Sequence, residues 1–253
     1  VQKWDEKLAK YAAESAKMEA NVGVGQFFSA KSGVLSWQDN PMPNNEMGVI
    51  IVDSIMENAY YDGEYDPSNP QPPRCFAFGR SEDELAPHER VVEAGNAQND
   101  SCKGCQFNEF GSADKGRGKA CKNTRRLALL PAGKFDKHGE FELFDDTEHF
   151  ESTEVGFMKL PVTSIKGYAT FVKQVAATLK RPPFGIVTKI KVVPDPNSQF
   201  KVIFEAIDNV PDELMSIILK RHEEIKPTID FPYELPSEEE VKPKGKSQTG
   251  KKT

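Results

Sequence analysis

The residues of this chain whose types and spacing best support chemistry are its four cysteines. Cys102 and Cys105 form a C-x2-C pair. Fifteen residues separate Cys105 from Cys121, and twenty-six residues separate Cys75 from Cys102. A C-x2-C turn brings two thiolates onto one metal ion, and four thiolates complete the tetrahedral shell of a structural Zn2+ site. We therefore predict a structural zinc ion with these metal ligands: Cys75, Cys102, Cys105 and Cys121.

Other uses of these thiols stay open. Sulfur ligands also hold iron–sulfur clusters, and cysteine is among the residues most often buried without any ligand. His88 is an alternative to Cys75 as the fourth ligand. We prefer Cys75, because a lone histidine in a polar loop is more often only exposed to solvent.

A glycine-rich basic run lies among and after the last cysteines. From Ser101 to Arg126 the chain has seven Lys and Arg residues against two acidic ones, whereas its total charge is -6. Glycines let a backbone approach phosphates closely, and the cations neutralise them. A solvated cationic loop accounts for the charge equally well. The nucleic-acid interpretation predicts phosphate contacts from six residues: Lys115, Arg117, Lys119, Lys122, Arg125 and Arg126.

A single-stranded nucleic acid also needs aromatic faces on which its bases can stack. Tyrosines near turns tend to stay partly exposed, and a tyrosine cluster lies beside turn-forming residues. The candidates for base stacking are Trp37, Tyr60, Tyr61, Tyr65, Phe107 and Phe110, and we prefer the first four. Phe107 and Phe110 lie next to the C-x2-C pair, and we expect them to cover the metal instead because Phe is so often buried.

Signatures of catalysis are missing from the sequence. Gly111 and Gly116 have the spacing of a P-loop, but Arg117 and Gly118 stand where that motif needs Lys and Ser or Thr. Neither H-E-x-x-H nor G-x-S-x-G occurs. The four histidines are scattered, at His88, His138, His149 and His222. We predict no catalytic residue, while a metal-dependent nuclease using unassigned carboxylates stays an alternative.

Composition places the chain among soluble globular proteins. Its 253 residues are 38% hydrophobic and 28% charged, enough to bury a sizeable core. No run approaches the roughly 18 consecutive apolar residues of a membrane span, and the N-terminal residues lack the apolar centre of a signal peptide. We therefore expect a cytoplasmic protein, in the host bacterial cytoplasm if the chain is viral, where cysteines are metal ligands more often than disulfides.

The elements that must position these residues can be read from the hydrophobic pattern. Apolar residues at helical spacing predict helices over 4–22, 163–179 and 211–225. A hairpin is expected over 184–193 and 198–207, joined by a turn at 194–197. Runs rich in β-branched and aromatic residues predict the other strands, which fall within 27–28, 34–37, 47–61, 74–79, 127–130, 141–144 and 156–160.

This inventory predicts an α+β fold built on a partly closed antiparallel β-barrel with helices and a zinc-binding loop attached. The predicted parts are an N-terminal amphipathic helix over 1–22, a domain over 23–226 and a flexible charged tail over 227–253. The zinc-binding insertion would occupy 75–126 within the domain. The tail is low in apolar residues and changes from acidic to lysine-rich, a pattern typical of disorder.

Together these features resemble the single-stranded DNA-binding proteins of bacteriophages, which combine an OB-like barrel with a zinc site. The resemblance rests on the CKGC sequence at 102–105, the basic run GSADKGRGKACKNTRR at 111–126 and the strand–helix–hairpin pattern from Leu160 to Val193. It covers roughly two thirds of the chain by organisation. In the best-known phage example, one histidine and three cysteines hold the zinc, whereas this chain offers four cysteines.

The resemblance implies an OB-like fold and non-catalytic, largely sequence-independent binding of single-stranded DNA, or of RNA, in phage-type replication or recombination. Replication or recombination proteins would be its partners. Two other functions stay open: a zinc-stabilised nuclease or other nucleic-acid-processing enzyme, and a viral protein-interaction module that acts on a host factor.

Overall fold

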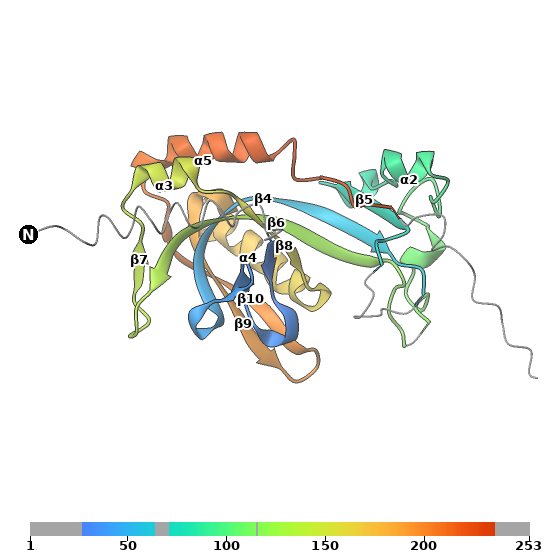
Figure 1. The fold of residues 1–253 in the computed structure, drawn as a ribbon, viewed down its shortest axis with the longest axis horizontal. Coiled ribbons are helices and arrows are strands. Elements are labelled where there is room, and N and C mark those ends of the chain that lie inside the picture. The colour runs from blue at the N-terminus through green and yellow to red at the C-terminus, as the bar shows by residue number, and fades with distance from the viewer. Residues whose placement is uncertain (1–26, 64–70, 115, 236–253) are drawn as a thin grey trace, which may run out of the picture. The chain divides into compact units, whose positions relative to one another are not determined.

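The computed structural model describes residues 27–63, 71–114 and 116–235 (Figure 1). The chain divides into two compact units. Within the described ranges, unit 1 consists of residues 27–54 and 125–229, and unit 2 of residues 55–124 and 230–235. The predicted helix over 1–22 lies outside the described residues.

The described residues form ten strands, which belong to one sheet. In chain order the strands are β1 Phe27–Ser29, β2 Ser36–Trp37, β3 Asn40–Pro41, β4 Glu46–Tyr60, β5 Cys75–Gly79, β6 Lys122–Phe135, β7 Phe141–Leu143, β8 Gly156–Leu160, β9 Ile186–Asp195 and β10 Gln199–Asn209. The sheet order is β10-β9-β4-β6-β8-β1-β2-β3, with β5 paired to β4 and β7 paired to β6. The pairing of β1 with β8 is parallel, whereas the other pairings with a determined register are antiparallel.

Four α-helices accompany the sheet in the part of the chain that the structure describes. They are α2 Glu89–Glu93, α3 Thr147–Ser152, α4 Ile165–Thr178 and α5 Asp212–Ile225. Helices α4 and α5 lie close to the predicted ranges, and β9 and β10 form the predicted hairpin. No helix among the described residues has both the length and the apolar content needed to cross a membrane.

The core of unit 1 lies between α4 and one face of the sheet. Val49 and Ile51 of β4 belong to the same buried cluster as Tyr168 and Phe171 of α4. Side chains alternate along a strand, so Ile50 of β4 points to the opposite face. Helix α5 lies on that opposite side (Figure 1). Because both faces are covered, this part of β4 is a continuous apolar run.

Ser164 shows how α4 is fixed to the sheet. It occupies the N-cap position of this helix, but its hydroxyl caps no helical amide. Instead the Ser164 Oγ accepts a hydrogen bond from the backbone N–H of Val202 in β10, at 2.8 Å. The hydroxyl thus satisfies a donor on an edge strand that has no neighbouring strand on that side.

The prediction of a mixed fold of helices and a largely antiparallel sheet is confirmed. The predicted partly closed barrel is not confirmed. Closure requires the two edge strands to pair with each other. Here β10 and β3 end the strand order, and no pairing joins them among the described residues. The sheet is therefore open.

Unit 2 is smaller and is built on the second half of β4. Met56 to Tyr60 pair with β5, in a register that places Tyr60 opposite Cys75. A small core forms around Ala77, Leu85 and Cys102, with Met56 packed against it. The predicted insertion over 75–126 falls in this unit except for its last two residues.

The tail was predicted to be flexible from residue 227, but its first part, 227–235, contains residues that pack against the fold. Ile229 is fully buried, and Tyr233 donates a hydrogen bond to the Glu57 carboxylate and packs against Phe76 and Phe78. These contacts bury apolar and aromatic surface that the low average hydrophobicity of the segment conceals. The rest of the predicted tail, 236–253, lies outside the described residues.

Candidate metal centre and its basic loop

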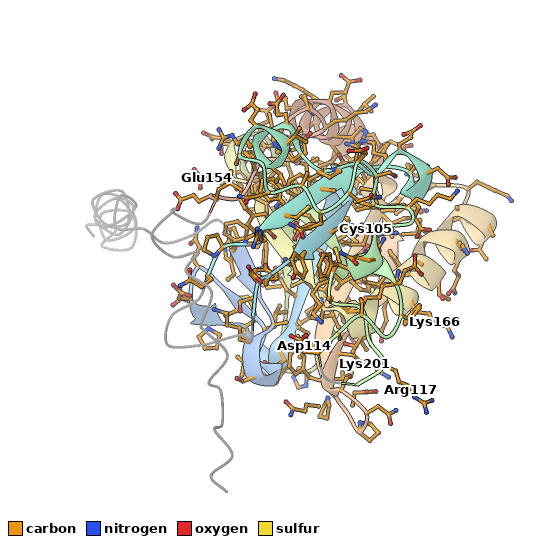
Figure 2. All side chains as sticks on the ribbon, turned by 90° about the vertical axis from the view of Figure 1, so that its right-hand side faces the viewer. Cys105, Asp114, Arg117, Glu154, Lys166 and Lys201 are labelled. Carbon is orange, nitrogen blue, oxygen red and sulfur yellow. The ribbon has the colours of Figure 1, made fainter. Side chains whose placement is uncertain are left out.

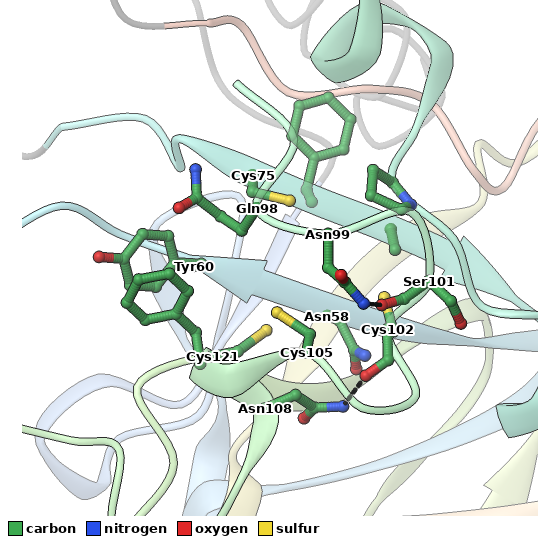
Figure 3. A pocket seen from close by; sticks show the side chains of 14 residues that line it. Asn58, Tyr60, Cys75, Gln98, Asn99, Ser101, Cys102, Cys105, Asn108 and Cys121 are labelled. Atoms are coloured by element: carbon green, nitrogen blue, oxygen red, sulfur yellow. Dashed lines mark hydrogen bonds between the residues drawn. The ribbon is translucent and has the colours of Figure 1, made fainter. Parts of the chain in front are cut away.

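The four cysteines line a single cavity in unit 2 (Figure 3). Cys75 is the first residue of β5, Cys102 and Cys105 lie in the segment after α2, and Cys121 comes directly before β6. The cavity has a volume of about 20 Å³. A space of this size holds one water-sized body, so it accommodates an ion and excludes an organic ligand.

Backbone hydrogen bonds bring these separate segments together. The N–H of Cys102 donates to the Leu85 carbonyl at 2.9 Å, and the N–H of Cys121 donates to the Phe107 carbonyl at 2.7 Å. The side-chain amide of Asn108 donates to the Cys102 carbonyl at 2.8 Å. The turn between Cys102 and Cys105 contains Gly104 with a φ of +77°, a conformation that glycine adopts without strain.

All four cysteines are free thiols in a desolvated setting. Cys102, Cys105 and Cys121 are at most 9% exposed. Burial, together with a smaller effect of the neighbouring Cys102, Cys75 and Cys105, raises the pKa of Cys121 to about 12. Burial also raises the pKa of Cys75 and of Cys102. Without a cation, the neutral thiols of Cys75, Cys102 and Cys121 are therefore favoured, whereas a bound divalent cation reverses this preference by attracting thiolates.

The thiols surround the cavity without yet closing on one point. Across the described ranges, no group of three or more His, Cys, Asp or Glu side chains already has an arrangement that could hold a metal ion. The Cys105 and Cys121 side chains point toward one another (Figure 3). A cysteine sulfur moves between staggered positions by rotation about one bond, so the thiols can change their direction within the cavity.

The chemistry of these residues fits zinc. Sulfur is a soft ligand that suits Zn2+ with bonds of about 2.3 Å. His88 does not line the cavity. Its Nδ1 accepts a hydrogen bond from the Arg90 N–H at 3.2 Å and so caps α2, while its ring packs on Phe76. The geometry therefore favours Cys75 over His88 as the fourth ligand.

Two aromatic rings close one side of the cavity. Tyr60 and Phe107 both line it, and their rings stack with centroids 4.3 Å apart. The expectation that Phe107 covers the site agrees with this position. Burial and the neighbouring Asp62 raise the pKa of Tyr60. Because one face of Tyr60 is already used, it is less suited to base stacking than we predicted.

The chain between Cys105 and Cys121 folds back on itself as a compact loop. The N–H of Gly111 donates to the Gly118 carbonyl at 3.0 Å, and the N–H of Ala113 donates to the same carbonyl at 3.2 Å. The Ser112 hydroxyl donates to the Glu109 carbonyl at 2.7 Å and accepts from the Ala120 N–H at 2.9 Å. The loop is therefore held by its own hydrogen bonds as well as by the cysteines at its ends.

Three of the six predicted phosphate contacts lie on or beside this loop in the described residues. Arg117 is exposed and points away from the fold (Figure 2). The Lys119 ammonium donates to the Asn108 side-chain oxygen at 3.3 Å, and the Lys122 ammonium donates to the Lys119 carbonyl at 3.0 Å. Lys115 lies outside the described residues.

The remaining two cations belong to unit 1, and one of them is corrected. Arg126 is 3% exposed and donates to the Ile229 carbonyl at 3.0 Å, so it serves the interior and not a phosphate. Its neighbour Arg125 is half-buried in β6, opposite Leu160 of β8. The local charge count could not detect this difference, because alternate residues of a strand point to opposite faces.

The predicted stacking residues are mostly engaged in packing. The ring of Trp37 stacks on that of Phe28 with centroids 4.1 Å apart, and it packs against the main core. The stacking on Phe28 covers one face of this ring, so Trp37 is less suited to base stacking than we predicted. Tyr61 is half-buried at the end of β4, and Tyr65 lies outside the described residues.

Phe110 was predicted to be buried over the metal, but it is exposed to solvent. Its exposed fraction is 82%. The Lys119 ammonium lies over its ring, 5.1 Å from the centroid. The available signal was its place in the polar, turn-forming sequence NEFGS, where no core is near.

Comparisons with protein-family models, with curated proteins and with solved structures give no match to this chain.

Proposed function

We propose that this chain is a non-catalytic single-stranded DNA-binding protein in which a structural zinc ion orders a basic loop. The observation that carries the proposal is the convergence of Cys75, Cys102, Cys105 and Cys121 on one cavity with room for a single ion. A shared metal ion explains why cysteines that are distant in the sequence surround the same small space.

The zinc ion would act by fixing the loop at both ends. Cys105 and Cys121 bracket the loop, so one ion bound to both closes it covalently through metal–sulfur bonds. The cations of the loop are then held in place before a ligand arrives, which lowers the entropy lost on binding. The ion supplies no bond-breaking chemistry in this proposal, because four protein ligands leave no open coordination position.

The charge of the loop suits it to a phosphate backbone. Arg117, Lys119 and Lys122 offer positive charge, which attracts any nucleic acid regardless of sequence. We therefore propose largely sequence-independent binding in phage-type DNA replication or recombination, in a reducing cytoplasm, with replication or recombination proteins as partners. The likeness to OB-like proteins stays part of this proposal. Because the sheet is open, the proposal rests on the loop and not on a barrel.

The four histidines lie in separate local environments. His149 hydrogen-bonds to the Pro131 carbonyl at 2.9 Å, and His222 to the Val52 carbonyl at 2.7 Å. His88 caps α2, and His138 is exposed beside a turn. Each of the four is thus accounted for by local structure, and they do not converge on a common site.

A binding titration tests the proposal. Labelled single- and double-stranded oligonucleotides of equal length are titrated with zinc-loaded protein and with chelator-treated protein, each at 50 and 200 mM salt. We expect preference for the single strand, weaker binding at high salt because counterions are released, and loss of binding after zinc removal. Affinity that does not change with salt contradicts the proposal, as does cleavage of the oligonucleotide when Mg2+ is added.

A further inference from the structure

We infer that Phe110 is a platform on which an unpaired nucleic-acid base stacks, beside the cations Lys119 and Arg117. This inference rests on the proposed function and makes it more specific, because it names the part of the ligand that the loop contacts besides phosphate. It also gives a reason for preferring a single strand, since the base faces of a duplex are already stacked on one another.

The exposure of Phe110 is the first observation. Among the large hydrophobic residues that are exposed in the described part of the chain, it has the highest exposed fraction, 82%. Phe107, three residues earlier, is half-buried and stacks on Tyr60. The same short segment therefore uses one phenylalanine to close the cavity and presents the other to solvent.

The rigidity of the loop is the second observation. Gly111, the next residue, donates its N–H to the carbonyls of both Arg117 and Gly118, at 3.2 and 3.0 Å. The Ser112 hydroxyl donates to the carbonyls of Phe107 and Glu109, at 2.9 and 2.7 Å. Phe110 is thus held at the surface by a network of hydrogen bonds, and a base that stacks on it need not order the loop.

The charge around Phe110 identifies the occupant. The Lys119 ammonium lies over the ring, 5.1 Å from its centroid, and is also held by the Asn108 side chain. Arg117 lies on the same loop and is exposed. An exposed aromatic ring beside fixed cations matches a ligand that offers flat aromatic surface and negative charge in alternation, which is a nucleic-acid strand.

Stacking, as opposed to charge alone, is tested with two ligands that differ only in their bases. An oligo(dT) strand and an abasic strand of the same length carry the same phosphates. We expect Phe110→Ala to weaken oligo(dT) binding roughly 5- to 150-fold, the range for loss of stacking on one aromatic residue. The same variant should bind the abasic strand as the wild type does, and Phe110→Trp should retain oligo(dT) binding.

Val92→Ala is the matched control, because Val92 is an exposed apolar residue (56%) of the same unit, on α2. This variant should bind both strands normally.

Zinc content and circular dichroism check that each variant is folded, and photocrosslinking with iodouracil-substituted strands should map to Phe110. Equal affinity of wild type and Phe110→Ala for oligo(dT) overturns the inference alone, and so does an equal loss on both strands. Failure of the wild type to bind either strand contradicts the proposed function as well.

Discussion

At the scale of single residues, the environment of a cation decides its role. Arg117 and Arg126 belong to the same basic run, and the local charge count treats them alike. Arg117 is exposed on the loop, whereas Arg126 is 3% exposed and bonded to the Ile229 carbonyl. A guanidinium in water offers its charge to a ligand, while a buried one satisfies an acceptor that would otherwise be unpaired.

This difference predicts opposite effects of the same substitution. Arg117→Gln should leave the free energy of unfolding unchanged and reduce the slope of log affinity against log salt by about 0.7 for a single strand. Arg126→Gln should lower the free energy of unfolding by about 1–3 kcal/mol, because a buried hydrogen-bonded group is lost, and leave the salt slope unchanged. Urea unfolding and salt titrations of the two variants give both quantities. The reverse pattern would show that Arg126 faces the ligand.

The cysteines show how far residue types can carry a prediction. Four thiols at these spacings could be assigned to one site from the sequence, because few arrangements other than a metal site use that pattern. The residues that cover this site could not be identified from the sequence. Phe107 and Phe110 are the same type and three positions apart, and only the hydrogen-bonded path of the loop determines which ring turns inward.

At the scale of elements, Gly156 fixes the approach of β1 and β2 to β8. A methyl group added at Gly156 would overlap the rings of Trp37 and Phe28. Those two rings stack with centroids 4.1 Å apart. The absent side chain of Gly156 therefore makes room for an aromatic pair, which is a packing role for Trp37.

We expect Gly156→Ala to lower the free energy of unfolding by about 1–3 kcal/mol, because the added methyl group overpacks this contact. Combining it with Trp37→Leu should cost less than the sum of the two single changes, since the smaller side chain relieves the overlap. Urea unfolding of the four proteins in the cycle measures this coupling. Additive effects would mean that the two residues do not contact each other. Trp37→Leu by itself should leave the affinity of the folded protein for single-stranded DNA unchanged.

The helices and the hairpin could be predicted because their patterns are local. The apolar stripe of α4 and the turn at 194–197 each specify an element without reference to the rest of the chain. Closure of the sheet is not local. Whether β10 pairs with β3 depends on strands that are far apart in the sequence, and the sequence pattern of an open sheet is the same as that of a barrel.

At the scale of the whole molecule, the acidic net charge and the basic loop have to be considered separately. The chain carries a net charge of -6, whereas the segment from Ser101 to Arg126 has an excess of positive charge. Electrostatic attraction of a polyanion depends on the local field where it binds, within a Debye length of about 8 Å at physiological salt. An acidic protein with a fixed cationic loop can therefore bind nucleic acid at that loop alone.

In the proposed function, a zinc ion bound by the four cysteines fixes the ends of this loop. The most direct test of this claim is the metal content of the purified full-length chain, measured by elemental analysis alongside the Cys105→Ser variant. We predict about one zinc per chain in the wild type, the stoichiometry of a single four-thiolate site, and substantially less in the variant. Wild-type protein that is folded, free of zinc and fully reactive toward thiol reagents would contradict the account, and iron in place of zinc would replace the assigned ion with a cluster.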